Sequence, residues 1–328
     1  MTRTNPYVFV VGCGRSGTTL LQRILDGHPR LAVANDSHFV LEPVTGYRPL
    51  HPVKGLEIGE DPSLTEDMVR ELKNYRTFPR TGLPVESIDH AASRASTWFG
   101  LVSALYDELA RHNGKEFAGE KSGRYVSIIP HLHAVFPRAR FIHIIRDGRD
   151  VTLSALHWVA KRAYRGPGQF ALYQHSPVAT CALWWAQYVR NGQRDGRALG
   201  ADVYHELRYE ELTTDTVSTV RRLMDFLELP YTEKMLRFHE GRTRDDERLS
   251  SKKRWLPPTP GLRDWRTGMA APDRELFEAL SGDLLAELGY ELGTTEASAA
   301  VGEAAAQYRR AWSEDLVQYA NTAQQTRD

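Results

Sequence analysis

The stretch Gly12-Cys13-Gly14-Arg15-Ser16-Gly17-Thr18-Thr19 directly follows an apolar run at residues 7–11, which predicts a buried strand. Its outer glycines lie five residues apart, ahead of a helical pattern at residues 18–25, so the backbone can wrap an anion and direct N–H groups toward it. Thr18 stands where nucleoside triphosphatases have a lysine that contacts the β and γ phosphates. The stretch therefore predicts a phosphate-binding loop and argues against ordinary NTP hydrolysis. Arg15 supplies a cation, which favours a nucleotide whose single 5′-phosphate carries a different transferable group.

Length and composition are those of a folded, soluble protein. The chain has 328 residues, of which 41% are hydrophobic and 26% charged, enough for one large α/β core or two small ones. Acidic and basic residues balance at 42 each, which argues against a nucleic-acid partner. Two cysteines are too few for a disulfide framework, and the first strand leaves no room for a signal peptide. No apolar run approaches the ~20 residues of a membrane span, so we expect a cytoplasmic protein.

Strand and helix patterns alternate along the chain. Apolar runs predict further strands at residues 31–34, 116–118, 140–145 and 203–207, and helical spacing predicts helices over 91–112, 182–190 and 216–227. This alternation predicts an α/β fold of the phosphate-loop type, in which helices cover both faces of a mostly parallel sheet and form three layers. Ligands bind such sheets at the carboxyl ends of the strands.

A break at residues 293–296 separates a predicted main domain, residues 1–292, from a C-terminal helical extension, residues 293–328. The extension carries an aromatic and apolar stripe at helical spacing, formed by Tyr308, Trp312, Leu316 and Tyr319. We expect this stripe to dock the terminal helix. The alternative is a partner surface in a homo-oligomer.

A second candidate anion site follows the predicted strand at residues 140–145. Arg146 stands at the strand's carboxyl end, and Ser154 lies in the first turns of a helix that we expect to begin at residue 151 with Asp150 as its cap. A guanidinium and a hydroxyl so placed can converge on one phosphate. The alternative is a surface turn whose arginines pair with Asp147 and Asp150.

Together, the two segments resemble the sulfotransferases that use 3′-phosphoadenosine 5′-phosphosulfate as donor. The resemblance covers residues 8–291 and is strongest toward the branch of tyrosylprotein sulfotransferases and bacterial enzymes. It implies that the first loop, through Ser16, Gly17, Thr18 and Thr19, binds the 5′-phosphosulfate. It also implies that Arg146 and Ser154 bind the 3′-phosphate.

Smaller matches extend the resemblance to three further segments. Residues 36–39 take the place of a Glu-Ser/Thr-His-Phe segment, and residues 120–122 that of Asp-Lys-Thr-Pro. Residues 208–212 take the place of a Tyr-Glu-x-Leu segment, and the resemblance makes Tyr209 a cofactor-binding residue. The resemblance makes Lys121 the catalytic lysine and Asp36 the base. The family's branch has the longer glutamate at this position, so His38, whose side chain type has a pKa near ~6.5, is the alternative base.

The segment at residues 249–266 is similar to a late family loop that folds over the nucleotide. Ser251 and Lys252 are its candidate phosphate contacts, and a solvated basic turn is the alternative.

The expected reaction is sulfuryl transfer to an acceptor hydroxyl, with a small-molecule metabolite as the expected acceptor. Transfer of this kind is an in-line displacement that depends on positioning and charge stabilisation, to which Arg15 contributes a cation. The twelve histidines lack metal-ligand spacing, and we expect no metal. Two alternatives remain open: a phosphate-loop kinase of small molecules, and a nucleotide-binding protein without catalytic activity.

Overall fold

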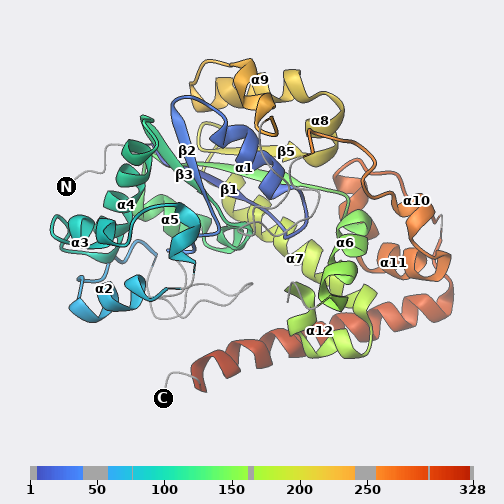
Figure 1. Cartoon of the computed structure of the whole chain (residues 1–328). Coiled ribbons are helices and arrows are strands. Elements are labelled where there is room, and N and C mark those ends of the chain that lie inside the picture. Colours follow the sequence, from blue (N-terminus) through green and yellow to red (C-terminus); the bar gives the residue numbers. More distant parts are fainter. Residues whose placement is uncertain are drawn as a thin grey trace. The chain divides into compact units, whose positions relative to one another are not determined.

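A computed structural model describes the chain over residues 6–39, 58–75, 77–161, 166–240, 256–294 and 296–325. Its five-stranded sheet has the order β2-β3-β1-β4-β5, formed by Leu31–Asn35, Phe117–Lys121, Val8–Val11, Arg140–Ile145 and Tyr204–Arg208. β1 pairs in parallel with both β3 and β4, and β2 pairs in parallel with β3 (Figure 1). The expected α/β fold with a parallel sheet is confirmed.

Side chains of β1 alternate between two apolar layers, as period-2 patterning requires. Val8 and Val10 point into a core shared with helices α1 (Thr18–Asp26), α8 (Tyr209–Thr214) and α9 (Thr216–Leu227). Phe9 points to the other face, where aromatic rings of α4 (Trp98–His112) and of the segment after β3 surround it. Both faces of the sheet are therefore covered, which explains why its central strands read as continuous apolar runs.

The described chain divides into two compact units. The sheet unit comprises Met1–Gly12, Gly17–Ile144 and Gly192–Thr259, and the second unit comprises Cys13–Ser16, Ile145–Asn191 and Pro260–Asp328. The sheet unit also holds α2 (Glu66–Lys73), α3 (Glu86–Ala92) and α5 (Ile129–Val135). The second unit holds α6 (Gly148–Ala160), most of α7 (Pro177–Arg197), α10 (Trp265–Gly268), α11 (Ala271–Glu287) and α12 (Ala299–Gln325).

The terminal helix α12 is docked within the second unit, as expected. Trp312 is buried against Phe170, with ring centroids 4.6 Å apart. The carboxylate of Asp315 accepts hydrogen bonds from the backbone N–H groups of Ala171 (3.1 Å) and Leu172 (2.8 Å). These contacts fix the helix to the start of a short 3-10 helix, Ala171–Gln174.

Three predicted boundaries are wrong. The single helix expected over residues 91–112 is two helices, α3 and α4, because the Thr97 side chain caps a new helix by accepting a hydrogen bond from Gly100 N–H (3.2 Å). α6 begins at Gly148 rather than at residue 151, because Asp147 and not Asp150 is its cap. β3 runs on to Lys121, so this lysine lies within the strand instead of after it.

Candidate active site

The phosphate-loop candidate connects β1 to α1, and its glycines occupy positions that other residues would strain. Gly12 and Gly17 have φ values of 145° and 94°. A Cβ at Gly12 would lie 2.5 Å from the backbone oxygen of Ile144, and one at Gly17 would lie 2.4 Å from the Tyr209 ring. Neighbouring atoms of the sheet unit therefore leave no room for a side chain at either glycine. The buried ring of Tyr209 packs directly against Gly17.

Gly17 is also the N-cap of α1 and brings no side chain to cap it. The first N–H groups of this helix are therefore suited to an anion, with Thr18 and Thr19 at its first two positions. Ser16 is fully buried, and its hydroxyl has no hydrogen-bond partner among the described residues. A buried hydroxyl without a partner fits a phosphate oxygen that would accept its proton.

Arg15 and Ser154 lie together in the second unit, although 139 residues separate them in the sequence. Arg15 Nε donates to Ser154 Oγ at 3.1 Å, and the guanidinium lies 5.3 Å from the centre of the Trp158 ring. Arg15 has a positive φ of 76°, a backbone conformation that costs free energy in a non-glycine residue. Arg15, which we expect at the 5′-phosphate, is therefore a neighbour of Ser154, which the resemblance assigns to the 3′-phosphate.

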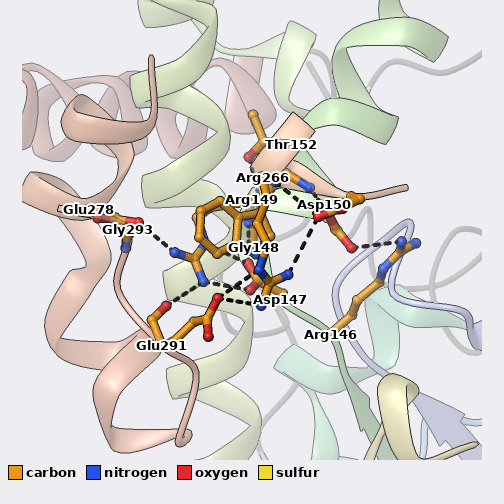
Figure 2. A network of polar contacts seen from close by, with 12 residues as sticks. Arg146, Asp147, Gly148, Arg149, Asp150, Thr152, Arg266, Glu278, Glu291 and Gly293 are labelled. Carbon is orange, nitrogen blue, oxygen red and sulfur yellow. Dashed lines mark hydrogen bonds and ion pairs between the residues drawn. The ribbon is translucent and has the colours of Figure 1, made fainter. Parts of the chain in front are cut away.

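Arg146 follows β4 directly and is buried beside α6 (Figure 2). Its guanidinium donates to Asp150 Oδ2 at 3.2 Å, and Asp150 also accepts the backbone N–H of Trp265 at 2.9 Å. Burial raises the pKa of Asp150 to about 6, although Arg146 favours its charged form. The anticipated pairing of the motif's arginines with its aspartates is thus present, but in a buried setting rather than a surface turn.

Arg149 has a structural role (Figure 2). It is fully buried, it donates to Asp147 through Nε (3.0 Å) and Nη2 (2.7 Å), and it pairs with Glu278. Its guanidinium stacks 3.5 Å from the centre of the Trp265 ring, and it donates to the backbone oxygen of Glu291. These contacts tie the start of α6 to the C-terminal part of the second unit.

Replacing Arg149 by methionine should destabilise the protein strongly, because it leaves the buried carboxylates of Asp147 and Glu278 without their cation. We expect the free energy of unfolding to fall by about 3–5 kcal/mol. Urea denaturation followed by circular dichroism measures it. Arg190→Met, which breaks a partly exposed ion pair with Asp283, is the matched control and should cost less than about 1 kcal/mol. Equal losses of unfolding free energy in the two variants would contradict a structural role of Arg149.

Asp36, His38 and Lys121 meet in the sheet unit, where β2 and β3 end side by side. Asn35 is in register with Lys121, and Asp36 N–H donates to Lys121 O at 2.8 Å, which extends the ladder by one bond. Lys121 Nζ donates to Asp36 Oδ2, and His38 Nε2 lies 3.8 Å from Asp36 Oδ1. Burial opposes the charge on Asp36, but Lys121 and His38 outweigh it and lower the pKa of Asp36 below its usual value. The group can therefore supply a buried cation next to a carboxylate that stays ionised.

Two predicted contacts, Ser251 and Lys252, lie outside the described residues. Behind Asp36 and Lys121 lies a buried polar cluster formed by Glu120, Tyr106 and Tyr125. Glu120 lies in the matched segment at residues 120–122, but no role was predicted for it, and the two tyrosines were not singled out. The acidic residue directly before Lys121 was the available signal, because an acidic residue that is buried requires partners.

A family model described as the sulfotransferase family matches residues 6–233. The chain belongs to this family. Protein-tyrosine sulfotransferase A of Caenorhabditis elegans is 24% identical over 252 residues, which are 77% of this chain and 57% of that protein. Protein-tyrosine sulfotransferase of Drosophila melanogaster is 22% identical over 238 residues, 73% of this chain and 41% of that protein. The chain thus spans about half the length of these two relatives.

Two solved sulfotransferase structures share the fold. The sulfotransferase domain of the Synechococcus PCC 7002 olefin synthase has a TM-score of 0.59 at 23% identity and covers 89% of this chain and 97% of that domain. The sulfotransferase domain from the curacin biosynthetic pathway has a TM-score of 0.56 at 19% identity, with 88% and 99% covered. Among the helices described for this sulfotransferase family member, none combines the length and apolarity needed to cross a bilayer.

Proposed function

We propose that the protein transfers a sulfuryl group from 3′-phosphoadenosine 5′-phosphosulfate to the hydroxyl of a small-molecule acceptor. The observation that carries the proposal is the contact between Lys121 and Asp36 at adjoining strand ends, in a chain of the sulfotransferase family. Ser16, with its buried unpartnered hydroxyl, and the uncapped start of α1 support binding of the 5′-phosphate. Arg146 and Ser154, both buried, support binding of the 3′-phosphate.

In the proposed reaction, Asp36 takes the proton from the acceptor hydroxyl. The acceptor oxygen bonds to sulfur as the bond between sulfur and the 5′-phosphate oxygen breaks, and adenosine 3′,5′-bisphosphate leaves. Lys121 stabilises the charge that develops on the leaving oxygen, with Arg15 as a second cation on the phosphate. No covalent intermediate is needed, because the enzyme acts through positioning and charge.

The pH dependence of turnover distinguishes Asp36 from His38 as the base. The pKa of Asp36 lies below its usual value, so the carboxylate stays ionised as the pH falls from about 8 to about 5. We therefore expect kcat/KM to stay constant within about twofold over this range. A pH–rate profile measures it, with His38→Gln as the matched variant. An acid limb in the wild type that disappears in His38→Gln would assign the base to His38 instead.

Turnover itself tests the proposal. Purified protein is incubated with the phosphosulfate donor and a panel of phenols, alcohols and sugars, and products are detected by mass spectrometry. We expect a sulfated product and stoichiometric bisphosphate, and both should form far more slowly with Lys121→Ala. Magnesium-dependent ATP turnover with a phosphorylated product would instead support a phosphate-loop kinase. Nucleotide binding without turnover of any panel member would favour a binding protein.

A further inference from the structure

Glu120 is the most deeply buried acidic residue beside the candidate catalytic group. It lies on β3, in register with Phe9 of β1, and its side chain is fully buried. Its Oε2 accepts hydrogen bonds from the hydroxyls of Tyr106 (2.6 Å) and Tyr125 (2.8 Å). Its Oε1 accepts the backbone N–H of His38 at 2.7 Å. Oε2 is thus bound to two tyrosines of the core, and Oε1 binds the backbone of the segment that carries Asp36.

The backbone of this segment is strained and therefore needs hydrogen bonds that stabilise its conformation. Asp36 and His38 have φ values of 50° and 59°, in the left-handed region that non-glycine residues enter only at a cost. Other hydrogen bonds also support the backbone of this turn. Asp36 N–H donates to Lys121 O, and Thr77 Oγ1 donates to Ser37 O at 2.6 Å. Arg80 Nη1 donates to Asp36 O at 3.4 Å. Glu120 supplies the bond at the far end of the turn, at His38.

Each residue of the segment 120–122 contacts Asp36 or His38. Lys121 pairs with Asp36, and Ser122 Oγ lies 3.4 Å from His38 Nδ1. Glu120 completes the set through the backbone of His38. Without this acceptor, the partly buried His38 N–H would lose this hydrogen bond, and a small rotation of the turn would separate Asp36 from Lys121.

We infer that Glu120 is a positioning residue, which holds the Asp36–His38 turn so that Asp36 and Lys121 stay aligned for proton and sulfuryl transfer. The inference rests on the proposed function. What the turn requires from Glu120 is a hydrogen-bond acceptor at Oε1. Burial raises the pKa of Glu120, while hydrogen bonds to its carboxylate, of which that from Tyr106 has the largest effect, oppose the rise. A glutamine can keep its carbonyl on His38 N–H and donate its amide to a tyrosine hydroxyl, so it should replace the glutamate.

The test compares Glu120→Leu, which cannot accept a hydrogen bond, with Glu120→Gln. We expect kcat to fall about 100-fold in Glu120→Leu, as a misplacement near 1 Å can cause, and to stay within about threefold in Glu120→Gln. The affinity for adenosine 3′,5′-bisphosphate should change less than about threefold in both. Glu116→Leu, which removes an exposed glutamate just before β3, is the control and should leave kcat unchanged.

Hydrogen exchange of the His38 amide gives a readout that does not depend on the reaction. We expect exchange at least about tenfold faster in Glu120→Leu than in the wild type or Glu120→Gln, while amides of β1 keep their protection. Unchanged exchange and kcat in Glu120→Leu would overturn the inference. An equal fall of kcat in Glu120→Gln would also overturn it, because it would show that the negative charge of Glu120 is required rather than its hydrogen-bond acceptor. If Glu120→Leu does not fold, Glu120→Asp, whose shorter side chain withdraws from His38, must lower kcat and speed exchange. If the wild type shows no sulfuryl transfer, the proposed function fails, and the exchange comparison still decides whether Glu120 holds the turn.

Discussion

Replacing Lys121 by alanine should lower kcat by about 100- to 1000-fold while the affinity for adenosine 3′,5′-bisphosphate changes less than about threefold. Lys121 Nζ is the buried cation in contact with Asp36, and its side chain is 4% exposed. Its charge is needed when the leaving oxygen develops charge, whereas the bisphosphate product is held by other residues in the proposal. Steady-state kinetics and calorimetry measure the two quantities.

Lys73→Ala is the matched control for Lys121→Ala. Lys73 also forms an ion pair with an aspartate, Asp89, but is partly exposed and lies on α2. We expect its kcat to equal that of the wild type. Unchanged turnover in Lys121→Ala would remove this residue from the reaction. A large loss of bisphosphate affinity in the same variant would make it a binding residue.

Replacing Arg146 by alanine should weaken adenosine 3′,5′-bisphosphate binding roughly 10- to 100-fold and leave adenosine 5′-phosphosulfate binding unchanged. The second ligand lacks the 3′-phosphate, so the difference between the two ligands isolates the contact. The fold should tolerate the change, because Asp150, with a pKa of about 6, can take up a proton when its cation is removed. Calorimetry with both ligands measures the effect.

Arg194→Ala is the control for Arg146→Ala, because Arg194 is an exposed arginine paired with its neighbour Asp195. It should leave the affinity for both ligands unchanged. Equal weakening of both ligands in Arg146→Ala would refute the assignment of Arg146 to the 3′-phosphate. A smaller loss for the bisphosphate alone is expected in Ser154→Ala, because a neutral hydroxyl contributes less than a guanidinium.

Local patterns in the sequence were sufficient to predict the sheet and the loop. The run at residues 140–145 and the helix at residues 216–227 match β4 and α9, because continuous apolar runs and helical spacing both report burial. Gly12 and Gly17 were recognised by their spacing, and the backbone oxygen and the ring that crowd them explain why glycine is required. Asp36, His38 and Lys121 were proposed from the family resemblance, and their contact follows from the parallel pairing of β2 and β3, which brings the carboxyl ends of both strands to one edge.

Other features depend on partners that are distant in the sequence. Both Asp147 and Asp150 are good cap residues by type, so local sequence does not distinguish them as the cap of α6. In the structure Asp147 accepts the N–H of Arg149, whereas Asp150 accepts the N–H of the distant Trp265. The burial of Arg149 depends on Glu278, which lies 129 residues away. The role of Glu120 could not be predicted for the same reason, since its partners come from α4, from the turn after β2 and from the segment after β3. No periodicity in the sequence encodes such contacts.

The most direct test of the central claim is calorimetric titration of the purified wild-type protein with adenosine 3′,5′-bisphosphate and, separately, with ATP and magnesium. A phosphate loop with Thr18 in place of lysine, together with Arg146 and Ser154, predicts that the bisphosphate binds at least about 100-fold more tightly than ATP. Equal affinity for ATP, or no binding of the bisphosphate, would contradict the account.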